Sequence, residues 1–283
     1  MRRISGLVAG IVSLLPSVAR SQAAPLWRSV DISRQLRDTM PQRIRVQYAA
    51  GRVDVRGTGD PTLYAMHLRY DEARSTPLHR HDAEQHTTSL GLESRDSHLQ
   101  MSGGESGELR LMLPRTVLLD LDMEFGGTQA TLDLGEMSLR SVRLECGAAD
   151  AMLLFSRPNR VRMRDLEVNV GAADFTGRLL ANANADQIRV RGGLGSVDLD
   201  FNGKWTHDVS VVTRLAVGKL TLHVPADVGL RIEVQRVAAG FDHEGLVKRD
   251  DAWYSTNYDA APYKLKVQAE TFFGGIDVQR SAR

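Results

Sequence analysis

Apolar and polar residues alternate through most of the chain. Val117, Leu119, Leu121, Met123 and Phe125 are each separated by one residue, and most of the residues between them are acidic. The same alternation recurs over residues 166–170, 188–190, 209–217, 230–234 and 265–269. A period of two places the apolar side chains on one face of a strand and the polar side chains on the other. Beyond the first 23 residues, no stretch of the sequence keeps a helical period over three turns. The pattern predicts an all-β fold.

A motif of about nine residues recurs seven times in the second half of the chain. Each copy begins with a glycine or a small or apolar residue, has a small residue two positions later, and is mostly apolar at the fourth, sixth and eighth positions after its start. The steps between copies are 21, 24, 22, 23, 21 and 35 residues. The copies begin at Gly126, Gly147, Gly171, Gly193, Ala216, Val237 and Phe272. This period indicates a β-solenoid-like stack with rungs of about 22 residues and two short strands per rung.

Small residues mark the corner between the two strands of each rung. Glycine suits a sharp bend where neighbouring backbones approach closely, so we expect these corners not to tolerate a larger side chain. Stacking in register would form one interior column from Leu132, Leu153, Leu199 and Leu222. The neighbouring column would hold Ala130, Ala151, Phe175, Val197 and Leu220. Gly177 interrupts the third copy, and the sixth copy lacks the last two apolar residues of the motif.

The regularity of the repeat divides the chain. Residues 24–115 are predicted to form an N-terminal β segment, with a degenerate copy of the repeat at 43–56 and a polar hairpin. Residues 116–283 form the regular β-repeat domain. The last step is about 13 residues longer than the period, which predicts an insertion at 242–262. An insertion of this size could cap the open end of the stack or bind a ligand, and both alternatives stay open.

The first 23 residues read as an export signal. Arg2 and Arg3 precede a mostly apolar stretch, and Ser21 and Ala23 supply small residues for cleavage after Ala23. The stretch is short for a membrane span, and no other segment is apolar enough to cross a membrane. We therefore expect a bacterial protein of the periplasm or cell surface that is not transmembrane after cleavage of its signal peptide.

Charge and cysteine content narrow the class further. The formal net charge is +1, and basic and acidic residues alternate instead of forming a basic face, so nucleic acid is not an expected partner. Cys146 is the single cysteine of the sequence, which leaves no intramolecular disulfide. It continues the alternation of Val142 and Leu144, so we expect a buried and unreactive thiol.

Three histidines form the best metal-like cluster of the sequence. His79 and His81 would lie on one face of a strand, as some zinc and copper sites require, and His86 follows within the same polar stretch. The spacing to His86 matches no specific metal motif, so we expect a solvated hairpin. Metal binding by these residues stays open as an alternative.

Catalytic patterns are weak. Asp198 and Asp200 would share one strand face and, with Asp133, could serve a glycosidase or bind calcium, but solvated surface acids are the simpler interpretation. The sequence has no G-x-S-x-G elbow, and the glycines at 192–195 join two strands instead of opening a helix around a phosphate. We predict no catalytic residue, no cofactor-binding residue and no metal ligand.

The repeat resembles a known family. Residues 119–278 are similar to the toast-rack, adhesin-like β-strand repeats of bacterial envelope proteins, which are related to the C-terminal domain of LiaF-type cell-envelope stress regulators. The resemblance is carried by the Gly-Ala-Ala-Asp copies at Gly147 and Gly171, the GLGSVDL copy at Gly193, and the VGKLTL and FGGI segments at 217–222 and 273–276. Residues 43–114 look like the N-terminal companion segment. The resemblance implies a stacked β-repeat at the cell envelope and brings no catalytic residues.

Two functions from different classes follow. The leading hypothesis is a non-enzymatic exported envelope protein, an adhesin-like binding or scaffold module that recognises a protein or an envelope polymer. The alternative is a carbohydrate-active β-helix enzyme that acts on polysaccharide. The sequence identifies neither the ligand nor the oligomeric state.

Overall fold

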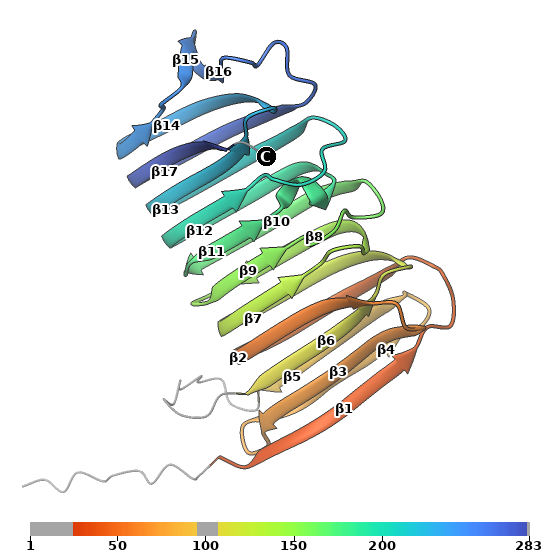
Figure 1. Cartoon of the computed structure of the whole chain (residues 1–283). Helices are drawn as coiled ribbons and strands as arrows, with labels where there is room; N and C mark the ends of the chain where they lie inside the picture. Colours follow the sequence, from red (N-terminus) through yellow and green to blue (C-terminus); the bar gives the residue numbers. More distant parts are fainter. Residues whose placement is uncertain (1–24, 95–106, 282–283) are drawn as a thin grey trace, which may run out of the picture.

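The computed structural model describes residues 25–94 and 107–281, and the predicted export segment 1–23 lies outside the described residues. Strands stack side by side along one direction, as the ribbons of Figure 1 show. One 3₁₀ helix, η1 (Leu180–Ala183), is the helical element of the described residues. The all-β prediction is confirmed.

Within the described residues, seventeen strands belong to one hydrogen-bonded sheet. In chain order they are β1 (Trp27–Gln35), β2 (Gln42–Thr58), β3 (Thr62–Asp71), β4 (Ser75–Asp82), β5 (Thr87–Ser94), β6 (Glu108–Pro114), β7 (Leu118–Asp133), β8 (Ser138–Cys146), β9 (Asp150–Leu154), β10 (Met163–Ala172), β11 (Phe175–Arg178), β12 (Ala185–Asp200), β13 (Val209–Pro225), β14 (Gly229–Asp242), β15 (Leu246–Arg249), β16 (Ala252–Ser255) and β17 (Lys264–Ser281).

The copies of the repeat stack in parallel and in register. Cys146 pairs with Phe125 on one side and Val170 on the other, and Gly192 pairs with Val170 and Leu215. The residues that follow these partners begin the motif copies, so the predicted starts lie in one line across the stack. The backbone N–H of Ser196 donates to the Asp174 carboxylate at 2.8 Å across one rung of 22 residues.

The prediction of two short strands per rung holds for only part of the stack. Two rungs are divided, into β8 and β9 and into β10 and β11. The prediction is wrong for β7, β12, β13, β14 and β17, which run through the corner as single strands. These strands are not interrupted because backbone pairing between neighbouring rungs continues through the corner. Leu194 and Gly195 in the corner of β12, for example, pair with Val217 and Gly218 of β13.

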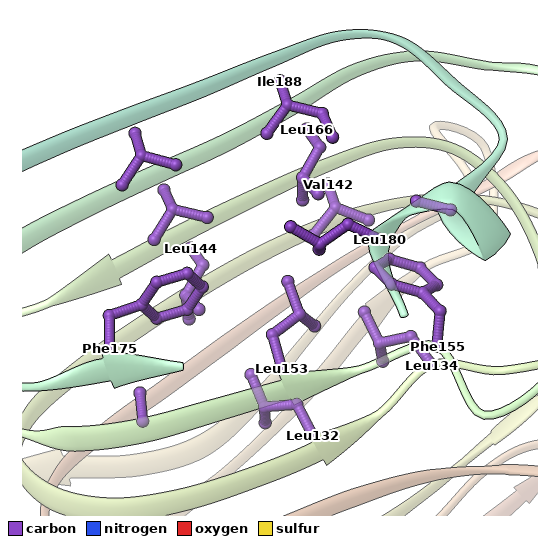
Figure 2. Packing of buried hydrophobic residues seen from close by; sticks show 14 of the residues in the cluster. Leu132, Leu134, Val142, Leu144, Leu153, Phe155, Leu166, Phe175, Leu180 and Ile188 are labelled. Atoms are coloured by element: carbon purple, nitrogen blue, oxygen red, sulfur yellow. The ribbon is translucent and has the colours of Figure 1, made fainter. Parts of the chain in front are cut away.

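The interior columns form as predicted. Ala130 pairs with Ala151 and Leu132 with Leu153, and further along the stack Val197 pairs with Leu220 and Leu199 with Leu222. Figure 2 shows Leu132 and Leu153 pointing toward a second layer that includes Val142, Leu166 and Ile188. The core of the protein therefore lies between two layers, one formed by the strand segments before the corner of each rung and the other by the segments after it.

The gap at Gly177 is filled by a neighbouring residue. A Cβ built on Gly177 would lie 3.1 Å from Cδ1 of Leu180, which is buried on η1. This short helix lies between Leu179 and Asn184, which both have positive φ, at 54° and 55°. The third copy thus lacks one apolar side chain on its strand, and the side chain of Leu180 in the following turn occupies that space.

The N-terminal segment continues the stack and then divides. The degenerate copy in β2 pairs with β7, with Val46 opposite Met123 and Val55 opposite Leu132. The first half of β2 then pairs with β5, which forms a hairpin with β4. The second half pairs with β6, which is followed by β3 and β1. The hairpin expected in the polar stretch is therefore β4–β5.

At the C-terminal end of the stack, the spatial order of the rungs differs from their order in the sequence. The C-terminal strand β17 pairs with both β13 and β14, so the seventh copy of the motif lies between the fifth and the sixth. This makes β14 the last rung, which explains why the sixth copy has lost two apolar residues of the motif. The predicted insertion forms the hairpin β15–β16 beside it (Figure 1). Trp253 of this hairpin packs on the core and lies 5.7 Å from Phe241, measured between ring centroids.

Candidate functional site

The bends of successive rungs form one edge of the stack, which we call the corner edge. Residues that start the motif copies form a first row along this edge, and the residues one position later form a second row. On the first five rungs the first row consists of alanine and glycine, namely Ala49, Gly126, Gly147, Gly171 and Gly193. In the second row, the first four rungs carry Ala50, Gly127, Ala148 and Ala172. From β12 onward the second row holds Leu194, Val217 and Phe273, and the first row holds Phe272 on β17 and Val237 on β14. Gly193, Ala216 and Ala238 remain small in these rows, so the edge becomes bulkier along the stack without becoming uniformly apolar.

The small half of the corner edge borders a concave surface, which we call the hollow. It has a volume of about 990 Å³, and Leu92 and Glu93 of β5 also line it. Three of the glycines along it are required by packing. A Cβ on Gly126 would lie 2.2 Å from the Ala49 carbonyl oxygen, and one on Gly171 or Gly193 would lie 2.6 Å from the carbonyl oxygen of Gly147 or Gly171, respectively. The close approach of the rungs therefore keeps the side chains at these bends small or absent.

The bulky half of the corner edge exposes a line of apolar side chains, which we call the ridge. Its members are Leu194, Val217, Phe272, Phe273 and Val237, with exposed fractions of 57, 42, 47, 54 and 74%. Leu194 pairs with Val217, and Val217 with Phe273, so these side chains are neighbours on adjacent strands. A contiguous line of exposed apolar residues is typical of an interaction surface.

Charged side chains flank both halves of the corner edge. The acids Glu124, Glu145, Asp150 and Asp174 lie within three residues of the small bends. The bases Arg191, Arg214 and Lys219 flank the ridge, and each side chain is more than half exposed, at 52, 61 and 59%. Their nitrogens lie 2.9 Å from Glu167, 3.2 Å from Glu270 and 3.3 Å from Asp277, respectively. The small half thus carries acids beside its bends, with Arg191 also lining the hollow, and each base beside the ridge is paired with an acid of a neighbouring rung.

The three histidines of the metal alternative do not form a ligand set. His79 is exposed on β4, while Nδ1 of His81 lies 2.9 Å from the Thr88 hydroxyl and Nδ1 of His86 lies 3.3 Å from the Gln42 amide nitrogen. Burial, and then the charge of Arg34, lowers the pKa of His81. Over residues 25–94 and 107–281, no group of three histidine, cysteine or acidic side chains is arranged to hold a metal ion.

The three aspartates of the glycosidase alternative do not converge. Asp133 accepts hydrogen bonds from the Ser156 hydroxyl and the Gly135 backbone N–H, and Asp198 lies 3.1 Å from Nε2 of His223. Asp200 is 9% exposed and accepts from the backbone N–H of Asn202. Asp133 and Asp200 are three rung steps apart, about 14 Å, which exceeds the separation of a glycosidase pair.

Cys146 is buried, as the alternation predicts, and burial raises the pKa of its thiol to about 12. Because the thiolate is the reactive form, we expect the native protein not to react with iodoacetamide at pH 8. Complete labelling of one thiol per chain should follow denaturation, measured by mass spectrometry. Rapid labelling of the folded protein would contradict the inward placement of Cys146.

The sequence patterns missed the buried asparagines at the end opposite the corner edge. The Asn159 side chain accepts from the Leu139 N–H and donates to the Leu139 carbonyl, both at 2.8 Å, and so replaces a backbone partner of that strand. Asn182 donates to the Phe155 carbonyl at 2.9 Å and accepts from the Lys204 N–H at 2.7 Å. The signal in the sequence was the recurrence of asparagine one period apart.

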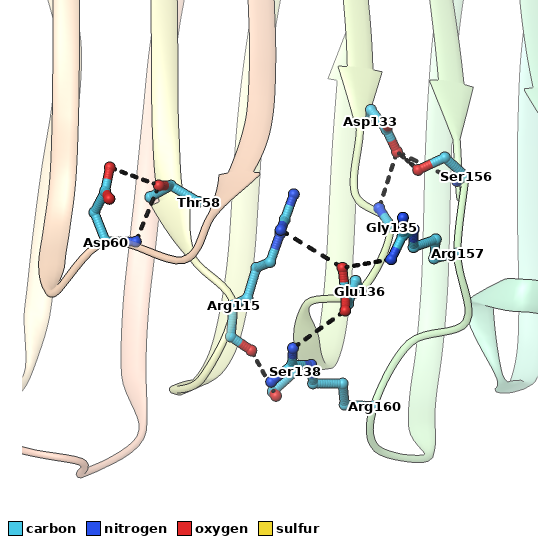
Figure 3. A network of polar contacts seen from close by, with 10 residues as sticks. All are labelled: Thr58, Asp60, Arg115, Asp133, Gly135, Glu136, Ser138, Ser156, Arg157 and Arg160. Carbon is cyan, nitrogen blue, oxygen red and sulfur yellow. Dashed lines mark hydrogen bonds and ion pairs between the residues drawn. The ribbon is translucent and has the colours of Figure 1, made fainter.

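A charged network joins the loops beside Asn159. Glu136 contacts Arg115 and Arg157 at 3.5 Å and Arg160 at 3.4 Å, so one carboxylate links three successive loops (Figure 3). The Ser138 hydroxyl donates to the Arg115 carbonyl at 2.9 Å. Each of these charged side chains is at least 30% exposed, so the network adds little stability in water. Arg157 and Arg160 therefore brace a turn, and the corner edge remains the best candidate site.

Comparison with known proteins gives one match to a family. Residues 28–162 match the model described as the N-terminal domain of toast_rack, DUF2154. No curated protein matches the chain. Among the described residues, no helix is long and apolar enough to span a membrane.

Solved structures with a similar arrangement are distant. A candidate cell adhesion protein from Clostridium sporogenes has 13% identity, covers 91% of this chain and 100% of its own, and has a TM-score of 0.49. A candidate adhesin from Bacteroides fragilis has 8% identity, covers 90% of this chain and 98% of its own, and has a TM-score of 0.40. At these values the likenesses carry no argument about function.

Proposed function

Because residues 28–162 belong to the toast-rack family, we propose that this chain is a non-enzymatic envelope protein that acts as an adhesin-like binding or scaffold module. Residues 1–23 direct its export to the periplasm or cell surface and are removed by cleavage after Ala23. Residues 24–115 are its N-terminal β segment, and residues 116–283 are a β-solenoid-like stack with rungs of about 22 residues. The insertion at 242–262 caps the last rung, and the corner edge binds a protein or an envelope polymer.

The ridge is the observation that carries this proposal. Five large apolar side chains on four adjacent strands are between 42 and 74% exposed. Exposure of this much apolar surface in one line is unfavourable in water, at roughly 25 cal/mol per Å², unless a partner covers it. Basic residues on both sides of the ridge supply the polar rim that is common at protein interfaces.

The alternative, a carbohydrate-active enzyme, has one observation in its favour. Glu124 and Glu145 pair on adjacent rungs and both line the hollow. Neighbouring rungs are about 4.8 Å apart, close to the separation of two carboxylates in a retaining glycosidase. However, both side chains already serve local contacts, since Glu124 accepts from the Gln47 amide at 3.2 Å and Glu145 binds Arg143 at 2.6 Å.

Cross-linked capture from the native envelope tests the proposal, with residues 24–283 as bait. We expect the wild-type chain to capture a protein partner, and the double variant Phe272→Ser, Phe273→Ser to lose at least about nine tenths of it, since interface energy concentrates in buried aromatic residues. Val247→Ser is the matched control. It removes a similarly exposed apolar side chain from the hairpin, 48% exposed, and should leave capture unchanged.

Equal capture by the wild type and the ridge variant would reject the corner edge as the binding site. Recovery of polysaccharide alone would favour the enzyme alternative, and turnover of that glycan would then be measured. In that case turnover should be lost in Glu145→Gln and kept in the ridge variant.

A further inference from the structure

The two halves of the corner edge have complementary shapes. At its bends the hollow is lined by the alanine and glycine residues of the first row, and the second row beside it is also small on four rungs. The ridge projects large apolar side chains from these two rows on the later rungs. The small bends run over five rungs, from β2 to β12, and the ridge runs over four, from β12 to β14, so the two halves meet at β12. One copy of the edge therefore carries both a projection and a depression of similar length.

From this complementarity we infer that the partner of the corner edge is a second copy of this chain, packed edge to edge with its stack reversed. This inference rests on the proposed binding function of the edge. A two-fold axis between the β10 and β12 rungs sets β13 against β8, and β17 against β7. Val217 then faces Gly147 and Ala148, and Phe273 faces Gly127, so each bulky side chain meets a bend without one.

Charge supports the same register. With the stack reversed, Lys219 beside the ridge faces Asp150 beside the hollow, and Arg214 faces Glu145. Glu270 would face Glu124, and Arg214 already lies 3.2 Å from Glu270 while Glu145 lies 2.6 Å from Arg143, so Lys219 and Asp150 are the pair that favours this register. Because the contact is isologous, each pair occurs twice, and the assembly closes as a dimer.

An anionic membrane fits these observations less well. The exposed aromatic residues and bases of the ridge would suit a lipid surface, but the acids Glu124, Glu145, Asp150 and Asp174 lie on the same edge and would be repelled by it. A second copy uses both halves of the edge, whereas a bilayer would use only one.

Sedimentation velocity over a range of concentrations tests the inference, with purified residues 24–283. We expect a dimer, and at least a tenfold rise in its dissociation constant for Asp150→Lys and for Lys219→Asp, because each change sets like charges against each other. The double variant Asp150→Lys, Lys219→Asp should return to within about threefold of the wild type, since it restores opposite charges across the contact.

A disulfide trap tests the register independently. Ala148 and Val217 are three rung steps apart in one chain, about 14 Å, too far for a disulfide within it. A chain carrying both Ala148→Cys and Val217→Cys should therefore form covalent dimers on oxidation. A chain carrying Ala148→Cys and Val247→Cys should not, because the hairpin lies away from the contact.

Other outcomes separate the inference from the proposed function. A monomer at all concentrations would overturn the dimer, and ridge-dependent capture of a different protein would leave the proposed function standing. Ridge-dependent binding of the monomer to phosphatidylglycerol vesicles would overturn the dimer and the protein-binding proposal together. A dimer that resists all the charge and ridge substitutions would overturn the placement of the contact.

Discussion

Replacing Gly274 with alanine should destabilise the stack strongly. Gly274 has φ of +125°, and a Cβ on it would lie 1.8 Å from the Gly218 carbonyl oxygen of the neighbouring rung. The backbone strain costs about 1–3 kcal/mol, and the displacement of a packed rung costs about as much again. We therefore expect a loss of about 2–6 kcal/mol in the free energy of unfolding, measured by urea denaturation at constant ionic strength.

The adjacent glycine supplies the control. A Cβ on Gly275 would meet nothing within 4 Å, and its φ lies outside the left-handed region. Gly275→Ala should therefore change the unfolding free energy by no more than about 0.5 kcal/mol. Similar effects for the two variants would show that the close approach of the rungs at Gly274 does not exist in solution.

Replacing Asn159 with alanine should have the second large effect. Asn159 is 4% exposed, and its amide satisfies the N–H and the carbonyl of Leu139 and the carbonyl of Val161. A buried backbone group left without a partner costs about 1–3 kcal/mol. Since at least two such groups would be affected, we expect a loss of about 2–5 kcal/mol, read from the same denaturation curves.

Asn169→Ala is the matched control for that change. Asn169 lies on the outer face of β10, partly exposed, and its removal should cost no more than about 0.5 kcal/mol. Equal losses in both variants would mean that Asn159 contributes through general propensity and not through the bonds to Leu139.

The repeat could be predicted because its physical cause is local. A side chain that recurs every two residues within a strand, and every 22 or so between strands, must face the same core, so the pattern alone places Leu132, Leu153 and Phe175 in the interior. Gly177 is recognisable as an interruption of that pattern, but its filling by Leu180 depends on a left-handed turn that no apolar pattern reveals.

The order of the last rungs could not be predicted in the same way. A parallel strand carries the same pattern whichever neighbour it pairs with, so nothing in residues 264–281 alone places β17 between β13 and β14. The long final step and the weak sixth copy are the two signals of this rearrangement in the sequence.

The candidate site escaped prediction for a related reason. Val217 ends the alternating run 209–217 and so reads as an interior position, yet it is 42% exposed at the bend, beside Phe273 at 54%. The sequence patterns instead indicated the insertion at 242–262 as a cap or a binding loop. In the structure, the hairpin of this insertion packs against the last rung.

The insertion of β17 also governs when the molecule can be completed during its synthesis. The 18-residue strand β17 lies between β13 and β14 in the sheet but follows both of them in the sequence. Both neighbours therefore leave the ribosome before the strand that links them. Until it arrives, β14 and its hairpin have no rung to pack on, and a truncated product would display two unpaired edges that invite aggregation.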